Sequence, residues 1–92
     1  MSKHNKTIRR LFSRPTDFGW NELVPLMRAL GFDLKVTSGS HRKFIHRSTG
    51  AVHFICEPHP SKVLKPYQVR DLIAFFKAQG IDHESDPEIS RI

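Results

Sequence analysis

Three short segments separated by turn residues constrain the fold of this chain most strongly, and the first of them alternates apolar and polar side chains. They span residues 32–37, 40–47 and 51–56, and each has the length of a single β-strand. Ser38-Gly39 separates the first two segments and Ser48-Thr49-Gly50 the last two, and residues of these types favour tight turns. Because such short turns join antiparallel neighbours, the pattern predicts a three-stranded antiparallel meander.

Segments with helical periodicity lie on both sides of the predicted strands. Residues 5–13 form a short amphipathic pattern that ends before Pro15. A second helix is predicted over residues 20–30, and a last helix begins at Pro66 and ends at Gly80. The predicted class is therefore α+β, an α-β-β-β-α arrangement preceded by an additional N-terminal helix.

Length and charge divide the chain into three expected parts. These are an N-terminal helix with its connector over 1–19, a domain over 20–81, and an acidic tail over 82–92 that we expect to be flexible. Four of the nine acids lie in that tail, which leaves fourteen Lys and Arg against five acids in residues 1–81. This excess predicts a polyanionic partner, and ninety-two residues are too few for a deep enclosed pocket.

The single cysteine, Cys56, excludes an intrachain disulfide and fits a reducing compartment. The polar N-terminus does not resemble a signal peptide, and no apolar run approaches the length of a membrane span. We therefore expect a cytoplasmic protein that does not associate with membranes. The histidines and acids show no spacing typical of zinc or magnesium ligands, so neither a metal nor another cofactor is expected.

Alternation along the strands assigns each side chain to one face of the sheet. The side chains expected to face the helices are Phe32, Leu34, Val36, Phe44, His46, Val52, Phe54 and Cys56. The open face then carries Ile45 and Ile55 and gathers five basic side chains, namely Lys35, His41, Lys43, Arg47 and His53. On this assignment Cys56 is buried and is not a nucleophile.

Aligning the core faces of the last two strands also predicts their register. A three-residue loop over residues 48–50 pairs Arg47 with Ala51, Lys43 with Ile55, and His41 with Glu57. The Glu57 carboxylate could then orient His41 or raise its pKa, although an edge ion pair without a role in chemistry is the more common outcome.

The step Gly39-Ser40-His41 is the strongest candidate for chemistry, because it places an imidazole at the start of a strand after a flexible turn. Histidine can take or give a proton near neutral pH, and the cations Arg42 and Lys43 follow it directly. Most histidines at such positions are surface residues without chemistry. What favours a role for this one is the sequence around it.

Several motifs together resemble the HicA family of bacterial toxins. They are the Leu-Gly-Phe end of the run 20–32, the step Gly39-Ser40-His41, the loop Pro58-His59-Pro60, and the helix start over residues 64–72. The resemblance covers about residues 20–80, and the segment before it is similar to longer members with an extra N-terminal helix. Lys65-Pro66-Tyr67 departs from the Lys-Gly-Thr step of the family.

This resemblance implies a fold like that of double-stranded-RNA-binding domains, an mRNA-cleaving activity and a HicB-type antitoxin partner. The implied protein is an mRNA interferase, the toxin of a type II toxin-antitoxin system, and His41 carries over as its catalytic residue. The expected chemistry is metal-independent acid-base catalysis in which the ribose 2′-hydroxyl attacks its own phosphodiester. Lys43 and Arg42 are the candidates to stabilise the charge that develops.

The remaining candidates complete the expected site. The predicted RNA-binding residues are Lys35, Ser40, Arg42, Lys43, Arg47, Lys62 and Lys65, and the auxiliary candidates are Gly39, His53, Glu57 and His59. Two alternatives stay open at this point. One is an RNA-binding module without catalysis, and the other is a structural partner in an antitoxin–DNA complex.

Overall fold

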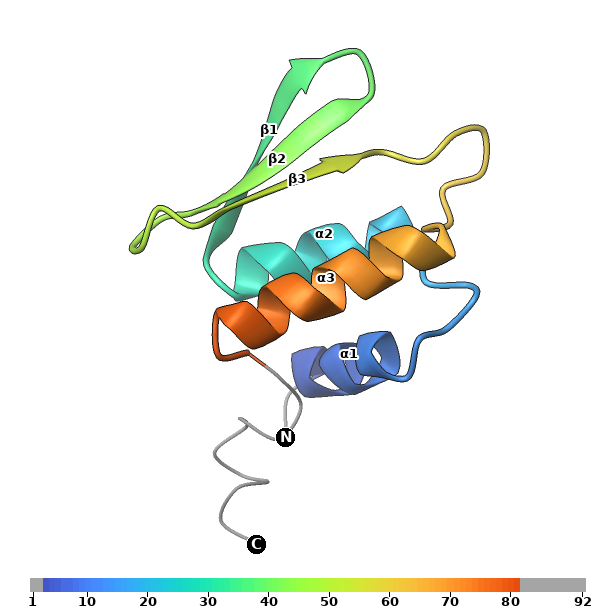
Figure 1. Cartoon of the computed structure of the whole chain (residues 1–92), viewed down its shortest axis with the longest axis horizontal. Helices are drawn as coiled ribbons and strands as arrows, with labels where there is room; N and C mark the ends of the chain where they lie inside the picture. The colour runs from blue at the N-terminus through green and yellow to red at the C-terminus, as the bar shows by residue number, and fades with distance from the viewer. Residues whose placement is uncertain (1–2, 82–92) are drawn as a thin grey trace, which may run out of the picture.

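The computed structural model describes residues 3–81, which form three layers, a sheet, a pair of helices and a third helix (Figure 1). In chain order the elements are α1 (Lys3–Phe12), α2 (Trp20–Ala29), β1 (Phe32–Ser38), β2 (His41–His46), β3 (Val52–Cys56) and α3 (Pro66–Ala78). This order confirms the predicted α+β class, and each boundary lies within about two residues of its prediction. The expected acidic tail lies outside the described residues.

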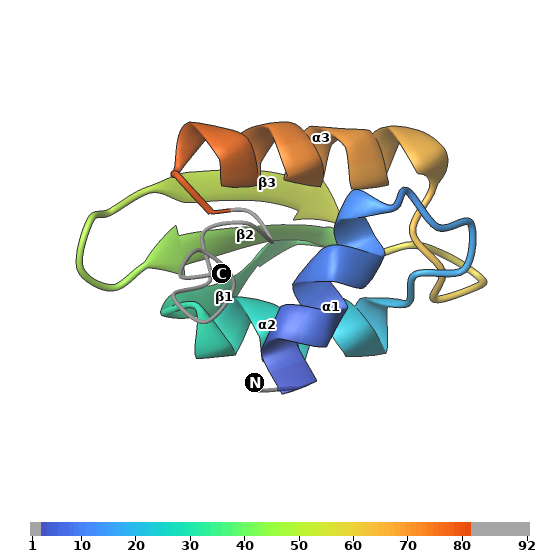
Figure 2. The same ribbon diagram turned by 90° about the horizontal axis from the view of Figure 1, so that it is seen from below.

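The sheet has the strand order β1-β2-β3 with both pairs antiparallel, as the short turns predict. Helices α2 and α3 run side by side under one face of this sheet (Figure 1). Figure 2, seen from below, shows α1 lying across α2 and α3 on the side away from the strands. Among residues 3–81, no helix covers the opposite face of the sheet, which is called the open face below.

A single core lies between the layers, and every element contributes to it. Its buried apolar side chains are Ile8, Leu11, Phe18, Trp20, Leu23, Leu26, Met27, Phe32, Phe44, Ile55, Leu64, Val69, Leu72, Ile73 and Phe76. Ile8 and Leu11 come from α1, so the additional helix packs into the same core as the strands and helices after it. Within residues 3–81, no helix is both long enough and apolar enough to cross a membrane.

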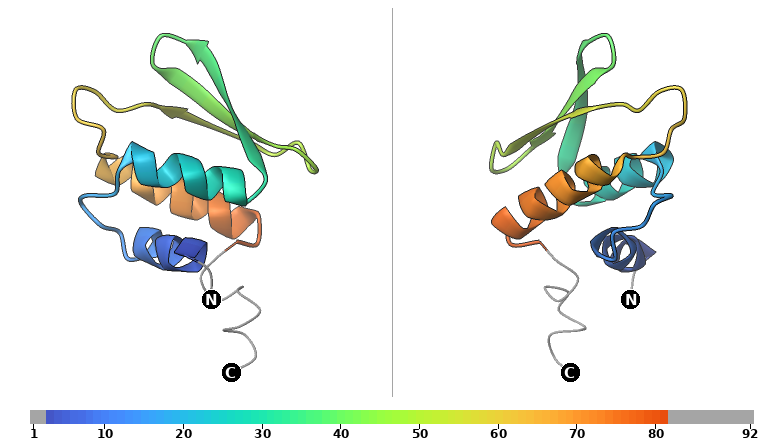
Figure 3. Two further views of the ribbon diagram at one scale, coloured as in Figure 1. Left: turned by 180° about the vertical axis from the view of Figure 1, so that it is seen from behind. Right: turned by 45° about the vertical axis from the view of Figure 1, so that its right-hand side comes forward.

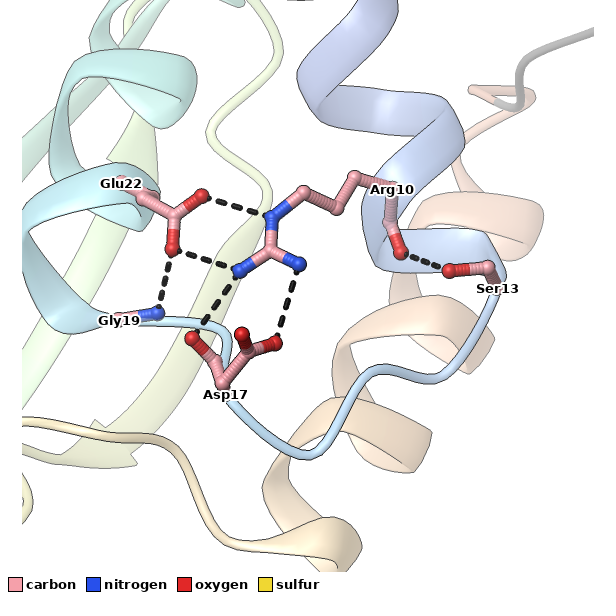
Figure 4. A network of polar contacts seen from close by, with 5 residues as sticks. All are labelled: Arg10, Ser13, Asp17, Gly19 and Glu22. Carbon is pink, nitrogen blue, oxygen red and sulfur yellow. Dashed lines mark hydrogen bonds and ion pairs between the residues drawn. The ribbon is translucent and has the colours of Figure 1, made fainter.

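One guanidinium ties α1 to the start of α2 (Figure 4). Arg10 binds both carboxylate oxygens of Glu22, at 2.9 and 3.0 Å, and it also contacts the side chain and carbonyl of Asp17. The same Glu22 carboxylate accepts the Gly19 N–H at 2.9 Å, which caps the first turn of α2. The hydrogen bond from Arg10 holds the pKa of Glu22 below its usual range, so the network is charged at neutral pH.

The register of β2 with β3 differs by one residue from the prediction. The connecting turn spans residues 47–50, since the His46 N–H donates to the Ala51 carbonyl at 2.8 Å. His41 therefore lies opposite Cys56, not Glu57, and Phe44 lies opposite His53. A shift of one residue moves every side chain of a strand to the other face.

The predicted faces of β3 are consequently wrong. Ile55 is buried and the His53 ring packs on Phe75 of α3, so these two side chains point toward the helices. Val52 and Phe54 are exposed on the other side, and Cys56 is only partly buried.

Two further predictions of strand faces have different outcomes. Val36 was expected in the core and is 68% exposed, because the β1–β2 hairpin rises away from the layer of α2 and α3 (Figure 3). His46 points inward as predicted. Its ring meets Phe32 edge to face, with centroids 4.9 Å apart.

The His46 imidazole joins three segments of the fold. Its Nε2–H donates to the Leu30 carbonyl at 3.1 Å, and Nδ1 accepts the N–H groups of Ser48 and Thr49. Gly31 adjoins this ring with a positive φ of 96°, and a Cβ there would lie 2.9 Å from Nε2. The Leu-Gly-Phe motif thus requires glycine for its backbone angle and for the space that the imidazole occupies.

We predict that Gly31→Ala destabilises the fold more than the same change at Gly50. Gly50 also has a positive φ, 76°, but open space around it, so its substitution adds only backbone strain of about 1–2 kcal/mol. Gly31→Ala also displaces the imidazole and its hydrogen bonds, which adds about 1–3 kcal/mol. Urea unfolding of the two variants measures the difference, and equal losses would contradict the proposed role of the ring.

Candidate functional site

His41 lies at the start of β2, at the tip of the projecting hairpin, and is exposed as predicted. Its Nδ1–H donates to the Ser38 carbonyl at 3.2 Å. This contact selects the tautomer whose Nε2 carries a free lone pair. A ring oriented in this way can accept a proton from a group that approaches from solvent.

Two lysines lie side by side on the open face next to this histidine. Lys35 of β1 and Lys43 of β2 are direct partners in the register, and neither has an ion pair within residues 3–81. Like charges directly opposite each other destabilise a sheet. Lys43 also shares the face of His41, two residues along the same strand, or about 7 Å away. The pair therefore costs stability and places two cations side by side next to His41.

Arg42 points to the other side of β2 and is occupied by contacts within the protein. Its guanidinium donates to the carbonyls of Gly39 at 2.7 Å and His41 at 3.1 Å, and it pairs with Glu57 at 3.1 Å. The Glu57 N–H in turn donates to the Ser40 carbonyl at 2.9 Å. These contacts, called the Arg42–Glu57 clamp below, fix the turn that carries His41.

The clamp also holds Lys62, whose ammonium pairs with the second carboxylate oxygen of Glu57. The hydrogen bond from Lys62 and then the charge of Arg42 hold the pKa of Glu57 below its usual range. Glu57 is therefore ionised at neutral pH and does not lie opposite His41. Arg42 and Lys62, two of the predicted RNA contacts, both have this carboxylate as their partner.

The structure places the other candidates around this centre. Arg47 pairs with Asp33 at 2.8 Å at the far end of the strands from His41. His59 is exposed in the loop before α3, and Lys65 is the exposed N-cap of that helix. His53 is half-buried against Phe75, and this burial lowers its pKa and favours the neutral ring.

A cavity of about 280 Å³ adjoins His41 on the side of α3. It is lined by Thr37, His41, Arg42, His53, Phe54, Ile55, Cys56, Tyr67, Gln68 and Asp71. The sequence reasoning missed the contributions of Phe54, Tyr67 and Asp71. The spacing of Tyr67 and Asp71 at i and i+4, off the apolar stripe of the last helix, was the one available signal.

Within the part of the chain that the structure describes, no group of three or more His, Cys, Asp or Glu side chains could hold a metal ion. The chemistry that the site itself offers is proton transfer at His41 beside the cations Lys35 and Lys43. The neutral His53 ring is a poor proton donor, and Cys56 lies on the cavity wall, not in the core as expected.

Comparison with known proteins identifies the family of this chain. No curated protein sequence and no solved structure matches the chain. A family model described as the HicA toxin of bacterial toxin-antitoxin systems matches residues 20–81, which run from the first residue of α2 to the end of the described chain. That match covers more than half of the sequence and includes His41 and the whole cavity lining. The chain therefore belongs to the HicA toxin family.

Proposed function

We propose that this protein is an endoribonuclease that cleaves mRNA in the cytoplasm, with His41 as its catalytic base and without a metal ion. The observation that carries the proposal is the exposed imidazole, with Nε2 free, beside the two adjacent lysines of the open face. Membership of a toxin family supports the assignment. Cleavage of a phosphodiester by an adjacent hydroxyl needs a base to take the proton and a cation to stabilise the developing charge, and this face supplies both.

In the proposed reaction, Nε2 of His41 takes the proton of a ribose 2′-hydroxyl. The 2′-oxygen attacks the adjacent phosphorus, the bond from phosphorus to the 5′-oxygen breaks, and a 2′,3′-cyclic phosphate forms. The leaving 5′-oxygen takes a proton from solvent, which reaches the exposed hairpin tip. Lys43 lies nearest along the strand and stabilises the charge that develops on the phosphoryl oxygens.

We predict that His41→Ala abolishes cleavage and leaves the fold and most of the RNA affinity intact. The side chain is exposed, so its removal shifts stability by less than about 0.5 kcal/mol. Loss of a positioned base lowers the cleavage rate about 100- to 10,000-fold. Labelled RNA incubated with excess chelator measures the rate, and thermal melting and anisotropy on the same preparation measure fold and binding.

The results of this experiment separate the proposed function from its rivals. RNA binding by the unmodified protein without cleavage indicates a binding module. The absence of both RNA binding and cleavage indicates a structural partner of an antitoxin. Cleavage by the variant at a rate near that of the unmodified protein contradicts the role of His41. If the unmodified protein cleaves RNA without chelator and stops when chelator is added, the metal-independent mechanism is wrong.

We further propose that a HicB-type antitoxin inhibits this toxin by covering the open face with acidic side chains. The substitution of both Lys35 and Lys43 by Ala should then weaken the binding of RNA and the binding of the antitoxin. For RNA, the slope of log affinity against log salt becomes shallower by about 1–2, because two phosphate contacts are lost.

The matched control for this pair is Arg28→Ala with Lys77→Ala, which removes two exposed cations from the last turns of α2 and α3. Net charge changes equally in both double variants, so only the location differs. Titration calorimetry with the purified antitoxin completes the comparison. If the control changes the salt slope and the antitoxin affinity as much as the lysine pair does, the open face is not the binding surface.

The Arg42–Glu57 clamp gives a separate prediction, with Arg42 as a positioning residue that acts through His41. Arg42→Ala leaves the carbonyls of Gly39 and His41 without their donor and frees the turn. A small misplacement of a reacting group lowers kcat by about 10- to 100-fold, while KM changes little.

Arg47→Ala is the control for Arg42→Ala, since it also removes one cation and one ion pair with an acid. We expect near-normal kcat for this control. If both variants change KM and leave kcat intact, Arg42 acts as a general RNA contact and the clamp has no positioning role.

A further inference from the structure

The cavity beside His41 has a size and position suited to one planar ring system. Its volume, about 280 Å³, lies just below the range that holds a whole small-molecule ligand. It opens between the edge strand β3 and the first turns of α3, and His41 is part of its lining. A nucleotide whose phosphate meets His41 therefore brings an adjoining base close to this cavity.

Two exposed aromatic side chains line the cavity. Phe54 is 70% exposed and Tyr67 is 49% exposed, and they are the exposed aromatic residues of the described chain. They come from β3 and α3, which are separate elements. Bases that leave a single strand stack on such rings, and each stacked base contributes measurably to affinity. Tyr67 lies on the side of α3, whereas the Phe54 side chain lies at the rim on the side of the open face. An exposed ring on the α3 side favours an aromatic ligand over an aliphatic one.

The polar groups of the lining decide which ligand atoms fit. Gln68 is only 4% exposed and uses both ends of its amide: Oε1 accepts the Lys65 N–H at 3.0 Å, and Nε2 donates to the Cys56 carbonyl at 2.9 Å. The guanidinium of Arg42 is occupied by the clamp. Neither residue has its main hydrogen-bonding groups free for a ligand.

The Asp71 carboxylate, unlike these two side chains, is not occupied by a contact within the described part of the chain. Its side chain is exposed, lines the cavity, and makes no hydrogen bond or ion pair within residues 3–81. A carboxylate only accepts hydrogen bonds, and it offers two oxygens to a pair of donors. The guanidinium of Arg42, which also lines the cavity, is occupied by the clamp, so a phosphate next to Asp71 would meet the negative charge of its carboxylate. The cavity therefore selects a neutral ligand with a donor edge.

We propose that this cavity binds a single unstacked guanine of the RNA, with its Watson–Crick edge on Asp71 and its ring against Tyr67, and with Phe54 at the rim of the cavity on the side of the open face. The assignment rests on the proposed ribonuclease function only for its location beside the scissile phosphate. Guanine presents two adjacent donors, N1–H and the N2 amino group, which match the two carboxylate oxygens. Adenine and cytosine place a ring acceptor beside their amino group, and uracil places carbonyls on both sides of its N–H.

Binding of 2′-fluoro oligonucleotides to the unmodified protein tests the proposal without cleavage, because these probes lack the attacking hydroxyl. The probes are fluorescein-labelled oligouridines with one central guanine, hypoxanthine or adenine base. Discrimination of 1–3 kcal/mol per bidentate pair corresponds to about 5- to 150-fold tighter binding of guanine than of adenine. Hypoxanthine, which lacks the amino group, should lie between them.

Two variants with the same change of charge locate the recognition. Asp71→Asn should lose the preference for guanine, since an amide presents one donor and one acceptor. Asp33→Asn, which removes a carboxylate on the open face outside the cavity, should keep it. Equal affinity for the three probes, or equal loss of preference in both variants, would overturn the proposal even if the protein cleaves RNA.

A guanine preference in a protein that fails to cleave any RNA would leave the base-binding proposal standing and reject the ribonuclease function. Cleavage sites in a random RNA pool provide a second measurement. Guanine enriched at one position next to the cut, and lost in Asp71→Asn, supports the proposal. Cuts without any base preference contradict it.

Discussion

The imidazole of His46 is the group on which the register of the sheet depends. One ring nitrogen donates to the end of α2 and the other accepts two N–H groups of the turn over residues 47–50. This arrangement holds the turn at its observed length, and the turn length sets the pairing of β2 with β3. The positions of Ile55 in the core and of Phe54 at the cavity both follow from that pairing.

The sequence was sufficient for the order of elements, because helical and strand periods differ and the turn residues separate them clearly. It was not sufficient for the faces of β3, since the run Val52-His53-Phe54-Ile55-Cys56 is apolar on both alternations. Val52, Phe54 and Cys56 share one face of the strand, whereas Ile55 is the one apolar side chain of the other face. The larger apolar set therefore predicts the wrong face as the buried one. The length of the turn, which His46 contacts, decides the question, and no local pattern reveals that contact.

The sequence likewise predicted some features of the candidate site and not others. The exposure of His41 and the location of Lys35 and Lys43 on one face followed from alternation, which the buried Phe44 anchors. Charge alone could not distinguish free cations from occupied ones. Arg42 and Lys62 read as RNA contacts in the sequence, whereas both hold Glu57 in the fold. An ion pair between residues fifteen positions apart depends on the loop that returns the chain, and periodicity carries no information about it.

A chain of this length was not expected to enclose a deep pocket, and the cavity beside His41 is open at the surface, with a buried polar contact that holds its walls in place. Gln68 joins the start of α3 to the end of β3 from within the protein, at 2.9 Å to the Cys56 carbonyl. Loss of that amide would leave buried groups unpaired, at about 1–3 kcal/mol each. The walls are therefore in place before any ligand arrives. A base that enters such a cavity loses its own freedom and orders little of the protein, which is how a small surface can discriminate between bases.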